Sequence, residues 1–171
     1  SPAVTNKLFS RQMSRPELVV YIEKLHDEVQ LPANRLQLEI TESAVIEVPE
    51  LAIGVLQRLS DLGVKVHLDD FGTGYSSLAY LQRFAVDFIK IDQGFVQRLD
   101  SDEGGSEIVQ AIVTLAQNLG MDPLAEGIET EEQLKIVRSL GCNYCQGYLF
   151  AKPMPPDELM EFLKRGPVDV G

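Results

Sequence analysis

Acidic side chains recur at the ends of short apolar runs, and their types and spacing suit the binding of hard metal ions. They are Glu39 and Glu42 after one run, Asp69 and Asp70 after the next, and Glu126 and Glu129 after a third. Oxygen ligands without His or Cys favour Mg²⁺ or Mn²⁺ over zinc. Adjacent aspartates can hold two ions a few ångströms apart, an arrangement that stabilises both the attacking and the leaving oxygen in phosphoester hydrolysis. The competing interpretation is that acids after strands are solvated or favour helix N-termini, and we apply it to Glu131 and Glu132.

Lys90 is the cation expected among these acids. It lies in the run Phe88-Ile89-Lys90-Ile91-Asp92, where alternation puts Lys90 and Asp92 on the side opposite the two isoleucines. A lysine among carboxylates can orient a water molecule and stabilise charge on a phosphoryl group, or it can form a Schiff base with a carbonyl substrate. Both possibilities stay open at the level of residue types.

The elements that position these residues alternate between short β-rich runs and longer helical patterns. Strands are expected at Arg35 to Thr41, Val64 to Leu68, Asp87 to Ile91, Pro123 to Ala125 and Tyr144 to Phe150, and helices at Ser14 to Leu25, Pro49 to Leu62, Ile108 to Leu119, Thr130 to Gly141 and Pro156 to Lys164. The absence of hairpin signals predicts an α/β fold with parallel strands. Acids at the ends of several strands favour a TIM-like barrel over an open sheet, which collects its site at one switch point.

The composition limits the possible partners. The chain has 171 residues, 44% of them hydrophobic, and a net charge of −11, which predicts a globular domain that repels nucleic acid polymers. An anionic substrate would need metal ions to neutralise the site. No apolar run approaches the roughly 18 residues of a membrane span, so a cytoplasmic location is expected, with domains outside this chain left open. Cys142 and Cys145 are expected to be largely buried thiols without a role.

Five segments in order resemble the EAL domain family. They are Leu38 to Ser43, Leu68 to Ser77, Ile89 to Asp92, Ala125 to Glu129 and Gln146 to Phe150, and the resemblance extends over residues 6–163. It implies a TIM-like (β/α)₈ barrel that hydrolyses cyclic di-GMP to linear pGpG with Mg²⁺ or Mn²⁺, using two ions.

The resemblance also implies a role for individual residues. The implied metal ligands are Glu39, Asp69, Asp70 and Glu126, with Asn6 as a further candidate in a segment one residue longer than the family pattern. Lys90 and Glu126 are the implied catalytic residues, and Lys90 is expected to orient or activate the attacking water. Asp92 and Gln146 are expected on the substrate side. Glu129 is expected to stabilise the loop from Phe71 to Ser77.

The front of the family pattern has no counterpart in this sequence. Its first two strands, with the Glu-Ala-Leu segment and the arginine after it, are missing, and a complete (β/α)₈ barrel takes about 250 residues. We therefore expect residues 1–171 to be a single partial domain with about strands three or four to eight. Exposed strand edges predict a homodimer or a strand-exchanged oligomer, and the missing glutamate predicts slow hydrolysis.

Two other functions are weighed against the phosphodiesterase. One is a non-catalytic EAL domain that senses cyclic di-GMP or docks a protein, and the other is a Schiff-base aldolase that uses Lys90. Degenerate EAL domains usually lose the acids or the lysine, which this sequence retains, so the sequence favours an enzyme. An aldolase gives no reason for so many carboxylates.

Overall fold

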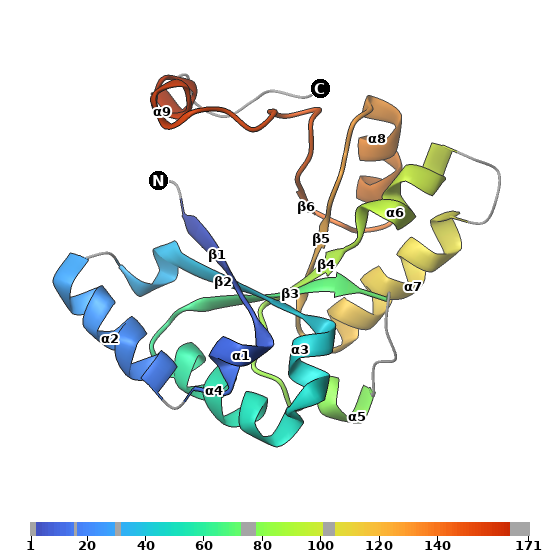
Figure 1. The fold of residues 1–171 in the computed structure, drawn as a ribbon. Coiled ribbons are helices and arrows are strands. Elements are labelled where there is room, and N and C mark those ends of the chain that lie inside the picture. Colours follow the sequence, from blue (N-terminus) through green and yellow to red (C-terminus); the bar gives the residue numbers. More distant parts are fainter. Residues whose placement is uncertain (1–2, 16, 30–31, 73–77, 101–104, 165–171) are drawn as a thin grey trace.

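Six parallel strands, paired in the order of the sequence, form one sheet in the computed structural model, which describes residues 3–15, 17–29, 32–72, 78–100 and 105–164 (Figure 1). The strands are β1 (Val4–Leu8), β2 (Leu36–Thr41), β3 (Lys65–Phe71), β4 (Phe88–Ile91), β5 (Asp122–Ala125) and β6 (Tyr144–Cys145). The helices are α1 (Ser10–Met13), α2 (Glu17–Val29), α3 (Glu42–Glu47), α4 (Pro49–Asp61), α5 (Leu78–Leu81), α6 (Gln93–Val96), α7 (Gly105–Asn118), α8 (Glu131–Ser139) and α9 (Pro156–Lys164), with 3₁₀ turns η1 (Ala33–Arg35) and η2 (Gln97–Asp100). The predicted α/β fold with parallel strands is confirmed.

The longer helices cover the outer face of the sheet with apolar side chains. In α4, Pro49 occupies the first turn, where its missing N–H costs nothing, and Leu56 and Leu59 are fully buried. Gly63 follows the helix with a φ of 81°, and its N–H donates to the Ser60 carbonyl at 2.8 Å. A left-handed residue of this kind ends a helix most readily when it has no Cβ. The chain can therefore turn directly into β3, against which α4 packs.

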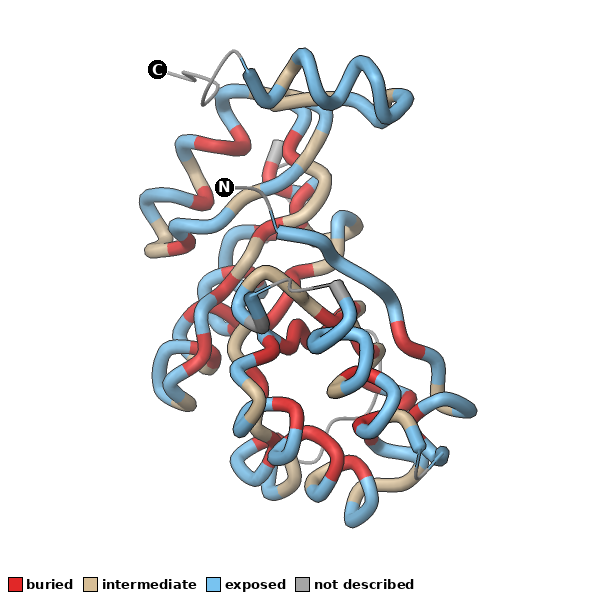
Figure 2. Tube along the Cα trace, turned by 90° about the vertical axis from the view of Figure 1, so that its left-hand side faces the viewer, coloured by how far each residue is buried: buried red, intermediate tan, exposed pale blue. Residues whose placement is uncertain are grey.

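Alternate residues of each strand face opposite sides of the sheet. Leu38 and Ile40 are buried in the outer core, and Ile40 pairs in register with Leu68 of β3, which in turn pairs with Ile89 of β4. Each such side chain stabilises the fold by about 1.5–3 kcal/mol relative to an exposed one. In Figure 2 the buried segments follow the strands and the facing sides of the helices, whereas α9 has no buried residue.

The last predicted strand is too long. It was expected from Tyr144 to Phe150, but pairing with β5 ends at Cys145. The chain then turns, because the N–H of Leu149 donates to the Ile128 carbonyl at 3.0 Å instead of continuing the ladder. The short helices α1, α3 and α6 were not predicted, and β1 is a regular strand where the sequence analysis left the third strand of the family pattern open.

The edges of the sheet are β1 and β6, each of which pairs on one side only within the described part of the chain. Four of the five residues of β1 are exposed. None of the helices in the described ranges combines the length and the hydropathy that a transmembrane span needs. Cys142 is buried, Cys145 is half-buried, and both are free thiols, as expected.

Candidate active site

The ammonium group of Lys90 binds three carboxylates from three different strand ends. Its Nζ lies 2.8 Å from Glu39 Oε1, 2.9 Å from Asp69 Oδ1 and 2.7 Å from Glu126 Oε1. Glu39 belongs to β2, Asp69 to β3, and Glu126 follows β5 directly. Because all three contact one nitrogen, their oxygens lie within two hydrogen-bond lengths of one another. The predicted convergence of these acids and the inward orientation of Lys90, which is 4% exposed, are confirmed.

Asp70 reaches the same face as Asp69 because the strand is irregular at this point. Adjacent side chains of a regular strand point to opposite faces. Between Leu68 and Phe71, however, the register of β3 against β4 shifts, and Asp70 has a φ of 57°. Such a left-handed conformation is uncommon for a residue with a Cβ and often marks a functional position. The bulge therefore turns two consecutive carboxylates toward the same cation.

That cation is Lys7, a residue that the sequence did not single out. Its Nζ lies 2.8 Å from Asp69 Oδ2 and 3.8 Å from Asp70 Oδ2, and its side chain is 41% exposed. Lys7 pairs in register with Glu39, so the two side chains share the inner face of the sheet. The alternation in β1 was the available signal, but in a short run it does not tell which set of residues faces inward.

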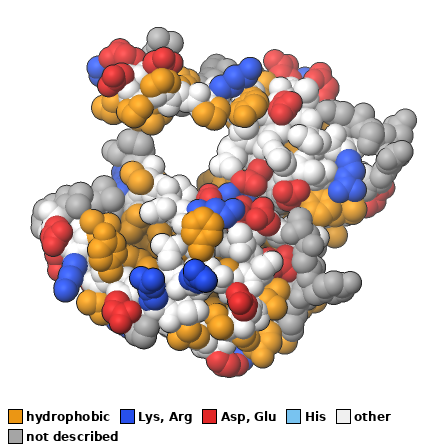
Figure 3. Space-filling model, in the orientation of Figure 1, with side chains coloured by type: hydrophobic (Ala, Val, Ile, Leu, Met, Phe, Trp, Pro, Cys, Tyr) orange, Lys and Arg blue, Asp and Glu red, His pale blue; other side chains and the backbone are white. Residues whose placement is uncertain are grey.

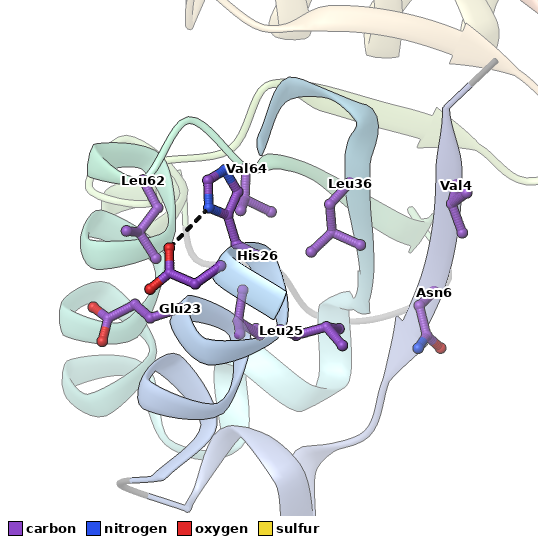
Figure 4. A pocket seen from close by; sticks show the side chains of 10 residues that line it. Val4, Asn6, Glu23, Leu25, His26, Leu36, Leu62 and Val64 are labelled. Carbon is purple, nitrogen blue, oxygen red and sulfur yellow. Dashed lines mark ion pairs between the residues drawn. The ribbon is translucent and has the colours of Figure 1, made fainter. Parts of the chain in front are cut away.

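Asn6, the remaining metal-ligand candidate, is not brought to this cluster. It pairs in register with Leu38, an outer-core residue, and therefore belongs to the outer face of β1. Figure 4 shows its side chain beside Val4 on the wall of a cavity of about 620 Å³ between β1, β2 and α2. The extra residue in this segment places Lys7, rather than Asn6, beside the acids.

The lysines and carboxylates shift one another's pKa. Burial alone would lower the pKa of Lys90, but hydrogen bonds to Glu126 and the two other carboxylates outweigh it and raise the pKa. Burial alone would raise the pKa of Asp69, but hydrogen bonds from Lys7 and Lys90 outweigh it and lower the pKa. For Glu126, burial exceeds the opposing effect of Lys90, so its pKa is raised. The hydrogen bond to Asp69 raises the pKa of Lys7. Both lysines are therefore cations at neutral pH.

Gln146 is joined to the cluster through Glu126. Its side-chain Nε2 donates to Glu126 Oε1 at 2.6 Å, and its main-chain carbonyl accepts from the N–H of Ile128 at 3.1 Å. Gly147 lies so close to Ile128 that a Cβ at this position would overlap the Ile128 backbone. The two loops after β5 and β6 are thus held together, and this fixes the amide of Gln146 beside the acids. On the face shown in Figure 3, acidic and basic side chains gather near the centre.

The carboxylates of Asp92 and Glu42 accept hydrogen bonds from backbone N–H groups. Asp92 begins α6, where its Oδ1 accepts from the N–H of Gly94 at 2.8 Å. Glu42, which is 2% exposed, accepts from the N–H of Gly72 at 3.1 Å and so holds the start of the loop after β3. The sequence assigned loop stabilisation to Glu129, but most of that loop, residues 73–77, lies outside the described residues. The role of Glu129 stays a prediction.

His67 shares the inner face with Glu39 and is buried. Its ring stacks on Phe88 with the centroids 4.5 Å apart, and neither ring nitrogen has a hydrogen-bond partner within the described part of the chain. Burial lowers the pKa of His67. We therefore describe it as a neutral packing residue of the inner face.

The donor set fits hard divalent cations by its chemistry. Four carboxylates on neighbouring strand ends offer only oxygen ligands, as Mg²⁺ and Mn²⁺ prefer. Among the described residues, no three His, Cys, Asp or Glu side chains already stand in a metal-binding arrangement. The carboxylates contact Lys90 and Lys7 instead, so an ion that binds here must replace some of these contacts.

The model of the EAL domain family matches residues 5–153, and the chain belongs to this family. It is 42% identical over 152 residues to cyclic di-GMP phosphodiesterase NbdA of Pseudomonas aeruginosa, which covers 89% of this chain and 19% of NbdA. The chain thus spans about a fifth of the length of this relative.

Solved structures show the same fold. The PaMucR phosphodiesterase in complex with c-di-GMP superimposes with a TM-score of 0.87 at 39% identity, over 92% of this chain and 64% of that one. The manganese and cy-diGMP complex of BlrP1 from Klebsiella pneumoniae superimposes with a TM-score of 0.79 at 32% identity, over 88% of this chain and 39% of that one.

Proposed function

We propose that this chain carries the catalytic residues of a phosphodiesterase that hydrolyses cyclic di-GMP to linear pGpG. The observation that carries the proposal is the binding of three carboxylates, from β2, β3 and the loop after β5, to the single buried ammonium of Lys90. In a reaction on a phosphodiester, Lys90 can stabilise the negative charge that develops, and the carboxylates can serve as ligands for metal ions. The names of the relatives support this choice of substrate.

We assign divalent cations, Mg²⁺ or Mn²⁺, to the carboxylates of Glu39, Asp69, Asp70 and Glu126. These residues supply oxygen ligands on one face of the sheet. When bound, such an ion supplies neutralisation of the phosphodiester charge and lowers the pKa of water. The manganese complex of BlrP1 supports the assignment.

Lys90 acts as a charged hydrogen-bond donor in this proposal, and not as a base or a nucleophile. Its hydrogen bonds to three carboxylates raise the pKa of Lys90 and favour the protonated form. A protonated amine cannot attack a carbonyl group, which argues against the Schiff-base aldolase. Its N–H groups can instead orient the attacking water and stabilise charge on the phosphoryl oxygens.

The substrate cavity adjoins Glu126 and Gln146. A cavity of about 620 Å³ is lined by both residues and by Gln93, Tyr148, Lys152 and Phe162. Aromatic faces suit stacking with a nucleobase, and amide groups can hydrogen-bond to its edges. We assign Gln146 and Asp92 to substrate binding on this side of the cluster, and Glu129, which also lines the cavity, to support of the loop from Phe71 to Ser77.

Hydrolysis assays with Lys90→Ala test the proposal. The purified chain is incubated with cyclic di-GMP and Mn²⁺, and the products are separated by chromatography. Loss of one positioned charge-stabilising group costs about 10²–10³ in turnover, so we expect at least that loss in Lys90→Ala. Lys65→Met is the control, because Lys65 pairs with Asp87 away from the cluster. Normal turnover in Lys90→Ala with a native circular dichroism spectrum would remove Lys90 from the mechanism.

A non-catalytic EAL domain that senses cyclic di-GMP or docks a protein is the second candidate function. The Lys7 contacts favour it, because both carboxylates of the adjacent aspartates already lie near an ammonium group. Tight binding of cyclic di-GMP without formation of pGpG would support this alternative.

We further propose that the chain self-associates through β1 as a homodimer or strand-exchanged oligomer. Four of the five β1 residues are exposed, and such an edge offers backbone N–H and C=O groups to a second strand. Light scattering on the purified chain should give at least twice the monomer mass of 19.0 kDa, and a monomer at micromolar concentration would contradict the proposal. The cytoplasmic location and the single partial domain stay predictions.

A further inference from the structure

Lys7 contacts the two carboxylates that we assign to metal binding. Asp69 is enclosed by ammonium groups, since Lys90 binds its Oδ1 at 2.9 Å and Lys7 binds its Oδ2 at 2.8 Å. Asp70 Oδ2 lies 3.8 Å from the same Lys7 nitrogen. The bulge in β3 turns both aspartates toward this side chain. The ammonium group of Lys7 therefore bridges Asp69 and Asp70 in the way that a metal ion would.

The charges of the cluster are already half balanced. When all groups are ionised, the carboxylates of Glu39, Asp69, Asp70 and Glu126 face the ammonium groups of Lys7 and Lys90. Four negative charges against two positive charges leave a net charge of minus two. One divalent cation neutralises that charge, whereas two would leave the site with an excess of positive charge before any substrate binds.

We propose that Lys7 is a fixed cation that takes the place of one of the two divalent ions at the Asp69–Asp70 pair, so that the chain binds a single ion in this cluster. The inference rests on the proposed function and specifies how many metal ions its site binds. A tethered ammonium needs no ion from solution, but it cannot lower the pKa of water as a metal does. Lys7 thus limits the metal chemistry of the site while it supplies part of the positive charge that a second ion would bring.

Manganese titration of the Lys7→Met variant tests the inference. Free Mn²⁺ is followed by its electron paramagnetic resonance signal, which gives the number of bound ions and their affinity without an activity assay. We expect one bound ion in the unchanged chain and a second ion in Lys7→Met. The second ion should bind at least about tenfold more tightly than any second ion in the unchanged chain, because a like charge is removed a few ångströms away.

Lys65→Met is the matched control. Lys65 is 46% exposed and pairs with Asp87 at 2.6 Å, much as Lys7 is 41% exposed and pairs with Asp69 at 2.8 Å. It begins β3, whereas the acids lie toward the end of that strand. Lys65→Met should retain the single ion. An equal gain of Mn²⁺ in both variants, or no gain or a loss in Lys7→Met, would overturn the inference.

The failure of this inference can be told from failure of the proposed function. Adding Asp69→Asn to Lys7→Met should abolish the second ion, and an unaffected second ion would show that Mn²⁺ binds elsewhere and would overturn the inference. Hydrolysis that requires Lys90, together with unchanged Mn²⁺ binding in Lys7→Met, would refute the proposed role of Lys7 but not the phosphodiesterase. A second ion in Lys7→Met, without hydrolysis or binding of cyclic di-GMP by the chain, would support the proposed role of Lys7 and refute the phosphodiesterase.

Discussion

The two faces of the sheet are made by alternate residues of the same strands, yet they contact different partners. On β2, Ile40 is fully buried in the outer core, whereas its neighbour Glu39 binds Lys90 on the inner face. On β4, Ile89 and Ile91 are fully buried outside, and Lys90 lies between them on the inside. One face contacts apolar side chains, and the other contacts mainly charged ones.

This difference shows how apolar packing on one face can offset the unfavourable burial of charges on the other. Burying a charge is unfavourable unless it is paired, and even a paired buried charge is weak evidence of stabilisation. The apolar contacts between the strands and the helices α4 and α7 are favourable without such pairing. The outer face therefore supplies most of the stability that holds the inner charges together, and the inner face carries the candidate active site.

The largest effect on folding is expected from Ile40→Ala on the outer face. Loss of a fully buried isoleucine removes apolar contacts and leaves a cavity, which lowers the free energy of unfolding by about 2–5 kcal/mol. Urea denaturation, monitored by circular dichroism, measures this change in the free energy of unfolding. The variant molecules that remain folded should still bind Mn²⁺ with the affinity of the unchanged chain. A loss below 1 kcal/mol would contradict the assignment of stability to the outer face.

The sequence predicted the parts of the molecule that follow regular periods. Strands β2 to β5 and the long helices were expected close to their observed positions, because alternation and 3.6-residue repeats report burial directly. The convergence of Glu39, Asp69 and Glu126 on Lys90 followed from the rule that parallel strands bring their carboxyl ends to one edge.

The parts that were missed depend on contacts between distant segments. The apolar run after Cys145 looked like a strand, but Gly147 packs against the backbone of Ile128 and the chain turns there. Lys7 was missed because β1 is a short and largely exposed strand, in which burial does not distinguish the two faces. The register of Lys7 against Glu39 and its contacts with Asp69 and Asp70 show that it faces the acids.

A much smaller effect on folding is expected from Glu39→Gln, the inner-face counterpart of Ile40→Ala. Gln keeps the shape of the side chain and can still accept a hydrogen bond from Lys90, which retains Asp69 and Glu126 as partners. The change removes one charge from a group of repelling carboxylates, so the free energy of unfolding should change by no more than about 1 kcal/mol.

The same variant should nevertheless lose function, since an amide is a poorer ligand for a divalent cation than a carboxylate. We expect Mn²⁺ binding at least about tenfold weaker and hydrolysis of cyclic di-GMP reduced by a similar factor or more. Denaturation, Mn²⁺ titration and product chromatography on Glu39→Gln and Ile40→Ala give a two-by-two comparison of neighbouring residues on opposite faces. If Glu39→Gln destabilised the fold as much as Ile40→Ala, the inner charges would be part of the stabilising core, and the division of labour between the two faces would be refuted.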